Sequence, residues 1–214
     1  DSDLYREHPD WAIHIDEREG VQSRNQMVLD LSRDEVCEYV INAVSDILAN
    51  ANIEYVKWDM NRQLTDMPRL GYNHEYTLGY YKIMSAITEK FPNILFEGCS
   101  AGGGRFDAAV LAYMPQIWTS DNSDAIARLK MQYSTSMCYP VYSISSHVTA
   151  SPNHQCGRVT SLKTRADVAY CGTFGYELDV TKMSDEEFEE IKAQIEFEKR
   201  IQDLMCNGDL YRLI

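Results

Sequence analysis

The chain has 214 residues, of which 44% are hydrophobic and 25% are charged, a composition typical of a soluble globular domain with one sizeable core. Its formal net charge of -13 argues against a nucleic-acid partner, because such a partner needs a basic footprint. No segment provides the roughly 18 apolar residues of a membrane-spanning helix, so no membrane partner is expected.

The chain alternates short β-rich runs with amphipathic helical patterns. Strands are predicted at residues 25–31, 53–59, 93–99, 116–121, 141–150 and 173–180. Helices are predicted at residues 32–51, 73–91, 122–137 and 161–171, with a short helix that ends at Tyr113 and a long one from Ser184. Two helices begin with a capping-box pattern, Ser32 with Glu35 and Ser184 with Glu187, which would satisfy free backbone N–H groups.

Six strand–helix units follow one another without a long linker, which predicts parallel strands covered by helices. Two folds fit this order: an open doubly wound sheet, or a (β/α)₈ barrel without its first two units. A barrel gathers functional residues at the carboxyl ends of several strands, whereas an open sheet gathers them at one switch point. Asp59, Cys99, Asp121 and His147 lie at or near the ends of four predicted strands. We therefore predict a single partial (β/α)₈ barrel domain, an α/β fold, over residues 1–214.

The segment "YVKWDMNR" at residues 55–62 places charged residues in a predicted strand. Because alternate side chains of a strand point to opposite faces, Tyr55, Lys57 and Asp59 should share one face and Trp58 the other. An apolar face with a charged opposite face is typical of a strand that lines an active site. The alternative is an edge strand with a surface ion pair.

Two aspartates at strand ends, Asp59 and Asp121, suggest glycoside chemistry, because retaining hydrolysis uses one carboxylate as nucleophile and another as acid/base. Lys57 would lie beside Asp59 and keep it ionised. Asp121 directly precedes a predicted helix and could equally be its N-cap. Asp124 is expected in the first helical turn, where it would favour the helix dipole.

The glycine-rich run "CSAGGGRFD" lacks the spacing of a phosphate-binding loop, so its glycines are expected to let the backbone approach a ligand closely. Cys99 should face the same way as Lys57 and Asp59, but no neighbouring residue in the sequence would activate it. Trp118 could stack on a sugar or pack in the core.

No metal site is expected, because His147 and His154 have no clustered third ligand. The six cysteines form no CxxC pair, which leaves a zinc ribbon or a thioredoxin-type motif unsupported. A chain of this length does not need disulfides, so we expect reduced thiols and a cytoplasmic location. The chain begins at Asp1 without an initiator methionine, and we expect it to be a piece of a longer protein.

The motifs "KWDMNR", "CSAGGGRFD" and "MPQIWTSDNSDAIARL" together resemble the melibiase-type α-galactosidases of glycoside hydrolase family thirty-six. The similarity runs through essentially all 214 residues, including "DLYREHPDWAIH" near the start and "SSHVTASPNHQ" later. The resemblance implies a retaining mechanism on a (β/α)₈ barrel, without a metal or an organic cofactor.

The resemblance also implies a role for individual residues. Asp59 matches the nucleophile on the fourth barrel strand, and Asp121 matches the acid/base on the sixth. Five residues match positions that line the galactose pocket: Arg24, Lys57, Cys99, Gly102 and Trp118. The implied substrates are α-galactosides such as melibiose and raffinose, cleaved through a galactosyl-enzyme.

The chain departs from the family in its extent. Similar enzymes carry a β-sandwich before the barrel and a smaller β domain after it, and neither is present here, nor are the first two barrel strands. Ala101 stands where a serine is common. Members often form tetramers, so a homo-oligomer is expected for the full-length protein. Two alternatives remain open: an α-galactosyl transferase that makes raffinose-type oligosaccharides, and a catalytically incomplete carbohydrate-binding fragment.

Overall fold

The structure is a computed structural model that describes residues 2–212. The chain folds into two compact units. The first unit contains the residues up to Ala101 together with residues 112–114, and the second contains Gly102–Leu111 and the residues from Pro115 onward.

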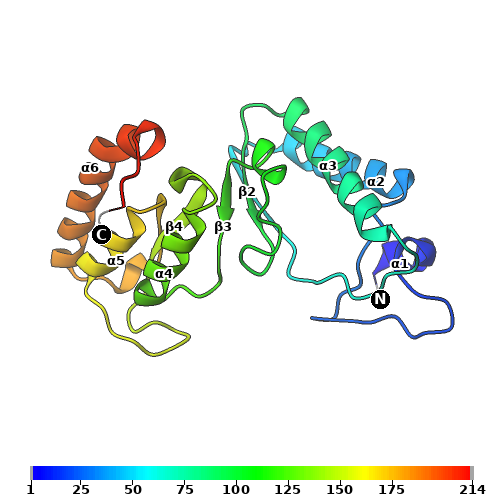
Figure 1. The fold of residues 1–214 in the computed structure, drawn as a ribbon, viewed down its shortest axis with the longest axis horizontal. Coiled ribbons are helices and arrows are strands. Elements are labelled where there is room, and N and C mark those ends of the chain that lie inside the picture. The colour runs from blue at the N-terminus through cyan, green and yellow to red at the C-terminus, as the bar shows by residue number, and fades with distance from the viewer. Residues whose placement is uncertain (1, 213–214) are drawn as a thin grey trace. The chain divides into compact units, whose positions relative to one another are not determined.

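The first unit is built on two parallel strands and two long helices (Figure 1). Its elements are α1 (Asp3–Glu7), the 3₁₀ turn η1 (Pro9–Trp11), α2 (Asp34–Asn50), β1 (Tyr55–Asp59), α3 (Tyr72–Lys90) and β2 (Leu95–Cys99). Strand β1 pairs with β2 so that Lys57 lies opposite Glu97 and Asp59 opposite Cys99. Helices α2 and α3 lie side by side.

The core of the first unit follows from the apolar spacing of α3. This helix buries Tyr72, Tyr76, Tyr80, Ile83 and Ile87, which recur every three or four residues and so share one face. Gly79 lies on the same side, and a Cβ atom there would lie 1.8 Å from the carbonyl oxygen of Leu31. The absence of a side chain at Gly79 therefore lets α3 pack directly on the backbone at that point.

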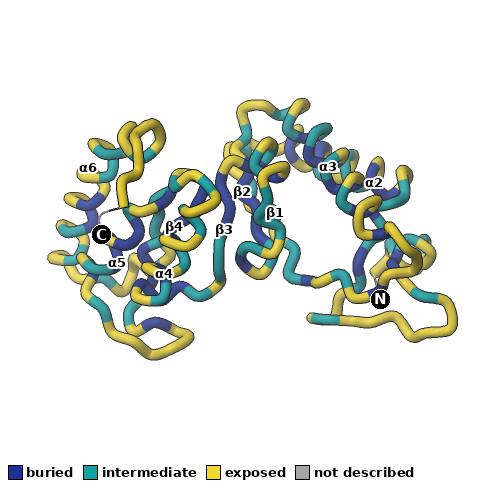
Figure 2. Tube along the Cα trace, in the orientation of Figure 1, coloured by how far each residue is buried: buried dark blue, intermediate teal, exposed yellow. Residues whose placement is uncertain are grey.

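The second unit contains three parallel strands, β3 next to β4 and β4 next to β5. Its elements are β3 (Gln116–Trp118), α4 (Ala125–Thr135), η3 (Val141–Ser143), β4 (Ile144–Thr149), α5 (Leu162–Ala169), β5 (Thr173–Glu177), η4 (Val180–Lys182) and α6 (Asp185–Asn207). Val148 of the central strand packs with Leu162, Ala166 and Ala169 of α5 and with Ile191 of α6. The remainder of α6 is mostly exposed or half-buried (Figure 2), as its many acidic residues predict.

The predicted fold class is confirmed. In each unit, strands that are neighbours in the sequence pair in parallel, and a helix joins them: α3 between β1 and β2, α4 between β3 and β4, and α5 between β4 and β5. This is the order of a (β/α) barrel, here a partial one. None of the helices within residues 2–212 is long and apolar enough to cross a membrane.

The first predicted strand, at residues 25–31, is wrong as a strand. This segment forms only an isolated bridge between Leu29 and Ala12, with hydrogen bonds from Ile13 N to the Val28 carbonyl and from Asp30 N to the Trp11 carbonyl. Val28 and Leu31 are buried, which explains the apolar pattern. An apolar pattern indicates that a segment is buried, but a β-strand also needs a neighbouring strand with which to form a series of hydrogen bonds. Within residues 2–212, the segment around Ala12 provides only one bridge.

Other local predictions have mixed outcomes. The capping box of Ser184 and Glu187 is confirmed, with both reciprocal hydrogen bonds present. The one at Ser32 and Glu35 is wrong: α2 begins at Asp34, and the Ser32 hydroxyl donates to the Asp30 carboxylate at 2.6 Å instead. The predicted short helix ending at Tyr113 is a single 3₁₀ turn, η2 (Val110–Ala112).

Candidate active site

The charged face of β1 meets a buried carboxylate on β2. Lys57 Nζ lies 3.4 Å from Glu97 Oε1, and the Tyr55 hydroxyl donates to Glu97 Oε2. Both side chains therefore lie on one face of the strand, as the alternation predicts. Lys57 forms its ion pair with Glu97 and not with Asp59. This corrects the expectation that the Lys57 ammonium keeps the Asp59 carboxylate ionised.

The pair between Lys57 and Glu97 is not a surface ion pair. Glu97 is fully buried, whereas the Lys57 side chain is 39% exposed. Burial of a carboxylate is costly unless a cation and hydrogen-bond donors compensate for the lost water. Lys57 and Tyr55 provide that compensation, so the position of the Lys57 ammonium is fixed by a group that sequence reasoning did not single out.

Asp59 is the last residue of β1 and is exposed. Asn61 Nδ2 donates to Asp59 Oδ2, and the backbone N–H of Ala101 donates to Asn61 Oδ1 at 3.0 Å. The Asn61 amide thus holds the Asp59 carboxylate and the turn after β2 together. Ala101 has a φ of +47°, in the left-handed region, where a residue without a large side chain is least strained.

Cys99 lies opposite Asp59 at the end of β2 and is buried. Its placement beside Asp59 agrees with the prediction that the two share a face. All six cysteines fall within residues 2–212, and none forms a disulfide.

Arg24 lies at the tip of a two-residue turn. Ser23 N and Gln26 N each donate to the carbonyl oxygen of the other, and Arg24 and Asn25 between them have φ values of +55° and +57°. These values are those of a type I′ turn, which favours asparagine and is strained for arginine. In the described part of the chain, no hydrogen bond or ion pair joins Arg24 to Asp59 or Lys57.

A buried arginine holds this turn at its base. Arg62 donates from Nε to the carbonyl oxygen of Gln26 at 3.2 Å and from Nη2 to that of Val21. A third donor reaches the Thr65 hydroxyl at 3.3 Å. The residues before and after the tip are therefore fixed by the loop that follows β1.

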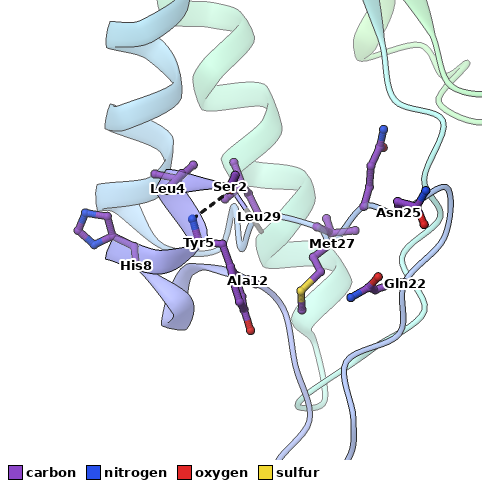
Figure 3. Close-up of a pocket in the computed structure, with 11 residues that line it drawn as sticks. Ser2, Leu4, Tyr5, His8, Ala12, Gln22, Asn25, Met27 and Leu29 are labelled. Atoms are coloured by element: carbon purple, nitrogen blue, oxygen red, sulfur yellow. Dashed lines mark hydrogen bonds between the residues drawn. The ribbon is translucent and has the colours of Figure 1, made fainter.

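A cavity of about 430 Å³ lies beside the same turn (Figure 3). It is lined by side chains from the region of α1, such as Tyr5 and His8, and by Gln22, Asn25 and Met27 of the turn region. None of the residues predicted for the galactose pocket lines it, so this cavity is separate from the predicted chemistry.

In the second unit, Asp121 follows β3 by three residues and is exposed. The N-cap of α4 is Asp124, whose carboxylate accepts from Ala127 N at 3.0 Å and pairs with Arg158. The N-cap interpretation of Asp121 is therefore wrong, and so is the placement of Asp124 inside the first turn. The Asp121 carboxylate is instead hydrogen-bonded by the Trp118 indole, at 3.1 Å from Nε1 to Oδ1.

Trp118 is 5% exposed and packs between elements of the second unit. Its ring stacks on His147 with 4.8 Å between centroids, and the Arg128 guanidinium lies 4.0 Å from its centre. Gly175, opposite His147 on β5, leaves room for the histidine, because a Cβ atom there would lie 2.9 Å from the imidazole. Trp118 thus presents its indole N–H to Asp121, while its ring packs against protein groups.

Arg128 of α4 is buried, at 4% exposed, and donates to two residues of the Asp121 loop. Nη1 lies 2.6 Å from the Thr119 hydroxyl, and Nη2 lies 2.8 Å from the Ser120 carbonyl oxygen. Burial lowers the pKa of the Arg128 guanidinium to about 10, so it still carries its charge at neutral pH.

Gly102 packs on the same loop. Its φ of +86° lies in the region that favours glycine, and a Cβ atom there would lie 2.7 Å from the Ser120 Cα. The neighbouring Gly103 donates its N–H to the Thr119 carbonyl at 3.0 Å. The sequence suggested that these glycines let the backbone approach a ligand. In the structure they instead let it approach the chain's own backbone at Thr119 and Ser120.

The predicted residues therefore form two groups and one outlier. Lys57, Asp59 and Cys99 lie on one strand pair of the first unit. Gly102, Trp118 and Asp121 surround one loop of the second. Arg24 lies apart, at its own turn. Within residues 2–212 no group of three or more metal-ligating side chains is found.

Four contributing residues were not predicted: Asn61, Glu97, Arg128 and Gln155. Asn61 and Glu97 lie in segments already singled out, and the glutamate inside the predicted strand "NILFEGC" was a usable signal. Arg128 and Gln155 act through contacts to residues 8 to 9 and 32 to 34 positions away in the chain, for which the sequence offers no local signal.

Comparison with known proteins adds the family. The family model described as Melibiase matches residues 1–208. The α-galactosidase AgaA from Geobacillus stearothermophilus is 52% identical over 221 residues, which cover 100% of this chain and 30% of AgaA. The bifunctional α-galactosidase/sucrose kinase AgaSK from Mediterraneibacter gnavus is 51% identical, with 100% of this chain and 23% of AgaSK covered. The chain thus spans less than a third of the length of these curated relatives.

Solved structures agree with the sequence comparison. The crystal structure of the GH36 α-galactosidase AgaA matches with a TM-score of 0.96 at 52% identity, and covers 100% of this chain and 31% of that one. A variant of AgaA in complex with raffinose matches with a TM-score of 0.97 at 51% identity and with the same coverage. The predicted resemblance is confirmed, and the chain belongs to the melibiase family.

Proposed function

We propose that the protein containing this chain is a retaining α-galactosidase in which Asp59 is the nucleophile and Asp121 the general acid/base. One observation carries the proposal. Both carboxylates are exposed and end or follow a parallel strand, whereas the acidic residues beside them, Glu97 and Asp124, are buried in an ion pair and a helix cap. Relatives named α-galactosidases, at about 50% identity over the whole chain, support it.

The chemistry has two steps. Asp59 attacks the anomeric carbon while Asp121 donates its proton to the glycosidic oxygen, so that the glycosidic bond breaks and a β-linked galactosyl ester forms. Asp121, now a carboxylate, takes a proton from water, which attacks the same carbon and releases α-galactose and free Asp59. Retention of configuration requires the two carboxyl groups to lie about 5–5.5 Å apart in the active enzyme.

The same comparison supports a proposal for the substrate class. Solved relatives hold raffinose and stachyose, both of which end in an α-linked galactose. We infer that Lys57, Cys99, Gly102, Trp118 and Arg24 surround that galactose. Lys57 is suited to bind a sugar hydroxyl because Glu97 holds its ammonium in place while 39% of its side chain stays accessible. The two steps need no metal or organic cofactor.

The nucleophile assignment is tested by Asp59→Ala in the intact protein. Hydrolysis of a nitrophenyl α-galactoside should fall by a factor on the order of 10⁴ or more, because the covalent intermediate no longer forms. Asp46→Ala is the matched control, since Asp46 is an exposed aspartate on α2 whose loss should leave turnover unchanged. Turnover that survives in Asp59→Ala would sink the assignment.

Azide distinguishes the two carboxylates. Azide added to Asp59→Gly should occupy the place of the nucleophile and yield β-galactosyl azide. Added to Asp121→Gly, it should attack the galactosyl-enzyme and yield the α-anomer. The opposite result would mean that the roles are exchanged. Analysis of the products from raffinose separates hydrolysis, which releases galactose, from a transferase, which would give larger oligosaccharides.

A further inference from the structure

The loop that carries Asp121 is held on both sides by side chains that are not part of it. We propose that Arg128 and Gln155 are positioning residues for the acid/base, and that they fix the backbone of residues 119–123 so that the Asp121 carboxylate meets the glycosidic oxygen. This inference rests on the proposed function, in which Asp121 transfers the proton.

Arg128 secures the side of the loop that precedes Asp121. Its guanidinium contacts three consecutive residues: it lies 4.0 Å from the ring centre of Trp118, and it donates to the Thr119 hydroxyl and the Ser120 carbonyl. Trp118 in turn donates to the Asp121 carboxylate. One side chain thus holds the backbone that leads to Asp121 and orients the ring that holds its carboxylate.

The partners of Arg128 are unusual for a buried cation. Within residues 2–212 it forms no ion pair, and Asp121 and Glu177 act on it only as more distant charges. Burial of an unpaired cation is costly. The start of α4 does not require it either, because Asp124 caps that helix. All its polar contacts go to the loop, so the loop is what this residue organises.

Gln155 secures the side of the loop that follows. Its Nε2 donates to the Asp121 carbonyl at 2.7 Å, and its Oε1 accepts from Ser123 N at 3.1 Å. The amide therefore spans residues 121 to 123. Asn153 supports it, because Asn153 Oδ1 accepts from Gln155 N at 3.0 Å and Asn153 Nδ2 donates to the Ser123 hydroxyl at 3.1 Å.

A general acid depends strongly on such fixing. Proton transfer requires the carboxyl group within hydrogen-bond reach of the glycosidic oxygen, and a misplacement of about 1 Å can cost about 10²-fold in rate. The loss in rate caused by a misplaced acid should depend on the leaving group. A nitrophenolate departs without being protonated, whereas a sugar or an alkoxide must be protonated as it departs.

The test compares two substrates in the intact protein: methyl α-galactoside, with a poor leaving group, and nitrophenyl α-galactoside, with a good one. For Arg128→Met and Gln155→Met, kcat/KM on the methyl glycoside should fall on the order of 10²-fold and 10-fold respectively. On the nitrophenyl glycoside, kcat/KM should change by less than about threefold, because kcat/KM reports bond cleavage and that cleavage needs no acid.

A second readout comes from the second step, the hydrolysis of the galactosyl-enzyme, in which Asp121 acts as the base. With a misplaced base the galactosyl-enzyme accumulates, so kcat and KM on the nitrophenyl glycoside should fall together, and azide, which needs no base, should restore kcat. Thr119→Val removes one acceptor of Arg128 without disturbing the charge and should give a weaker version of the same pattern. Lys130→Met, at an exposed position on α4, is the control.

Three outcomes are distinguishable. A loss of kcat/KM confined to the methyl glycoside, together with a fall in kcat on the nitrophenyl glycoside that azide restores, supports the proposal. An equal loss on both substrates, in the exposed Gln155 variant and in Thr119→Val as well as in Arg128→Met, would mean that these residues only stabilise the fold and would overturn it. If the unaltered protein cleaves neither substrate, the proposed function fails instead.

Discussion

Each unit of the molecule buries one arginine beneath a predicted functional residue, and the two arginines do so differently. Arg62 in the first unit holds only the base of the turn that bears Arg24, through the carbonyl oxygens of Val21 and Gln26. Arg128 in the second unit holds the loop up to the residue before Asp121, and Gln155 holds it from the other side. Arg24, which is assigned to binding, is thus held only through the base of its turn. Asp121, which is assigned to proton transfer, is held through the backbone on both sides of it.

The largest effect on the stability of the fold should come from substitution of the glycine that packs on the Asp121 loop. Gly102→Ala adds a Cβ atom 2.7 Å from the Ser120 Cα at a φ of +86°, so it combines backbone strain with a clash. We expect a loss of about 3 kcal/mol in the free energy of unfolding, since strain alone costs about 1 kcal/mol. Thermal unfolding measures it, at roughly 2–4 °C in Tm per kcal/mol.

The first unit offers the matched control for this substitution. Gly71 has a φ of +82°, and a Cβ atom there would have no neighbour within 4 Å. Gly71→Ala should therefore lose only about 1 kcal/mol, from strain alone. Equal losses in the two variants would show that the Asp121 loop yields to the added atom and is not tightly held.

Substitution of the two buried arginines should affect different kinetic constants, KM for Arg62 and the rate of the chemical steps for Arg128. Arg62→Met releases the turn of Arg24, so KM for melibiose should rise about tenfold while kcat stays within about twofold, as expected when binding is lost equally from ground and transition states. Steady-state kinetics of Arg62→Met beside Arg128→Met would show it. A fall in kcat in the Arg62 variant, with KM unchanged, would contradict the assignment of this turn to binding.

The smallest effect should distinguish a true helix cap from an apparent one. Ser184→Ala removes a confirmed cap of α6 and should cost about 1 kcal/mol. Ser32 has the same sequence pattern but bonds to Asp30 rather than to the backbone of α2. Ser32→Ala should therefore cost about half as much or less, and urea unfolding would rank the two. A larger loss for Ser32→Ala would show that the sequence pattern outweighs the observed contacts.

The sequence was most informative where a residue's role follows from its own strand. The runs that contain Lys57, Asp59 and Cys99 were correctly predicted as parallel strands with these side chains on one face, because alternation along a strand fixes direction. Segment 25–31 shows the limit of that rule. Its apolar residues are buried as predicted, but its pairing depends on a neighbour that the pattern does not contain.

The sequence was least informative about the loop of Asp121. Asp121 and Asp124 are three positions apart, and both are residue types that cap helices. Only the observed hydrogen bond from Ala127 N to the Asp124 carboxylate identifies Asp124 as the cap. Arg128 looks like an ordinary helical arginine, and Gln155 like an ordinary loop residue, because their partners lie far away in the chain or across a turn. Contacts of this kind come from tertiary packing, which local pattern does not encode.

The buried stack of Trp118 gives the molecule an optical signal of its own. Trp118 is only 5% exposed, and an indole shielded from water emits at a shorter wavelength than one in contact with it, so its emission shifts to the red when water reaches the ring. Because the same indole N–H is bonded to Asp121, any movement of that carboxylate away from the ring changes the surroundings of the fluorophore. With Trp11 and Trp58 replaced by phenylalanine, the emission of the remaining tryptophan would follow that movement in real time, without an added label.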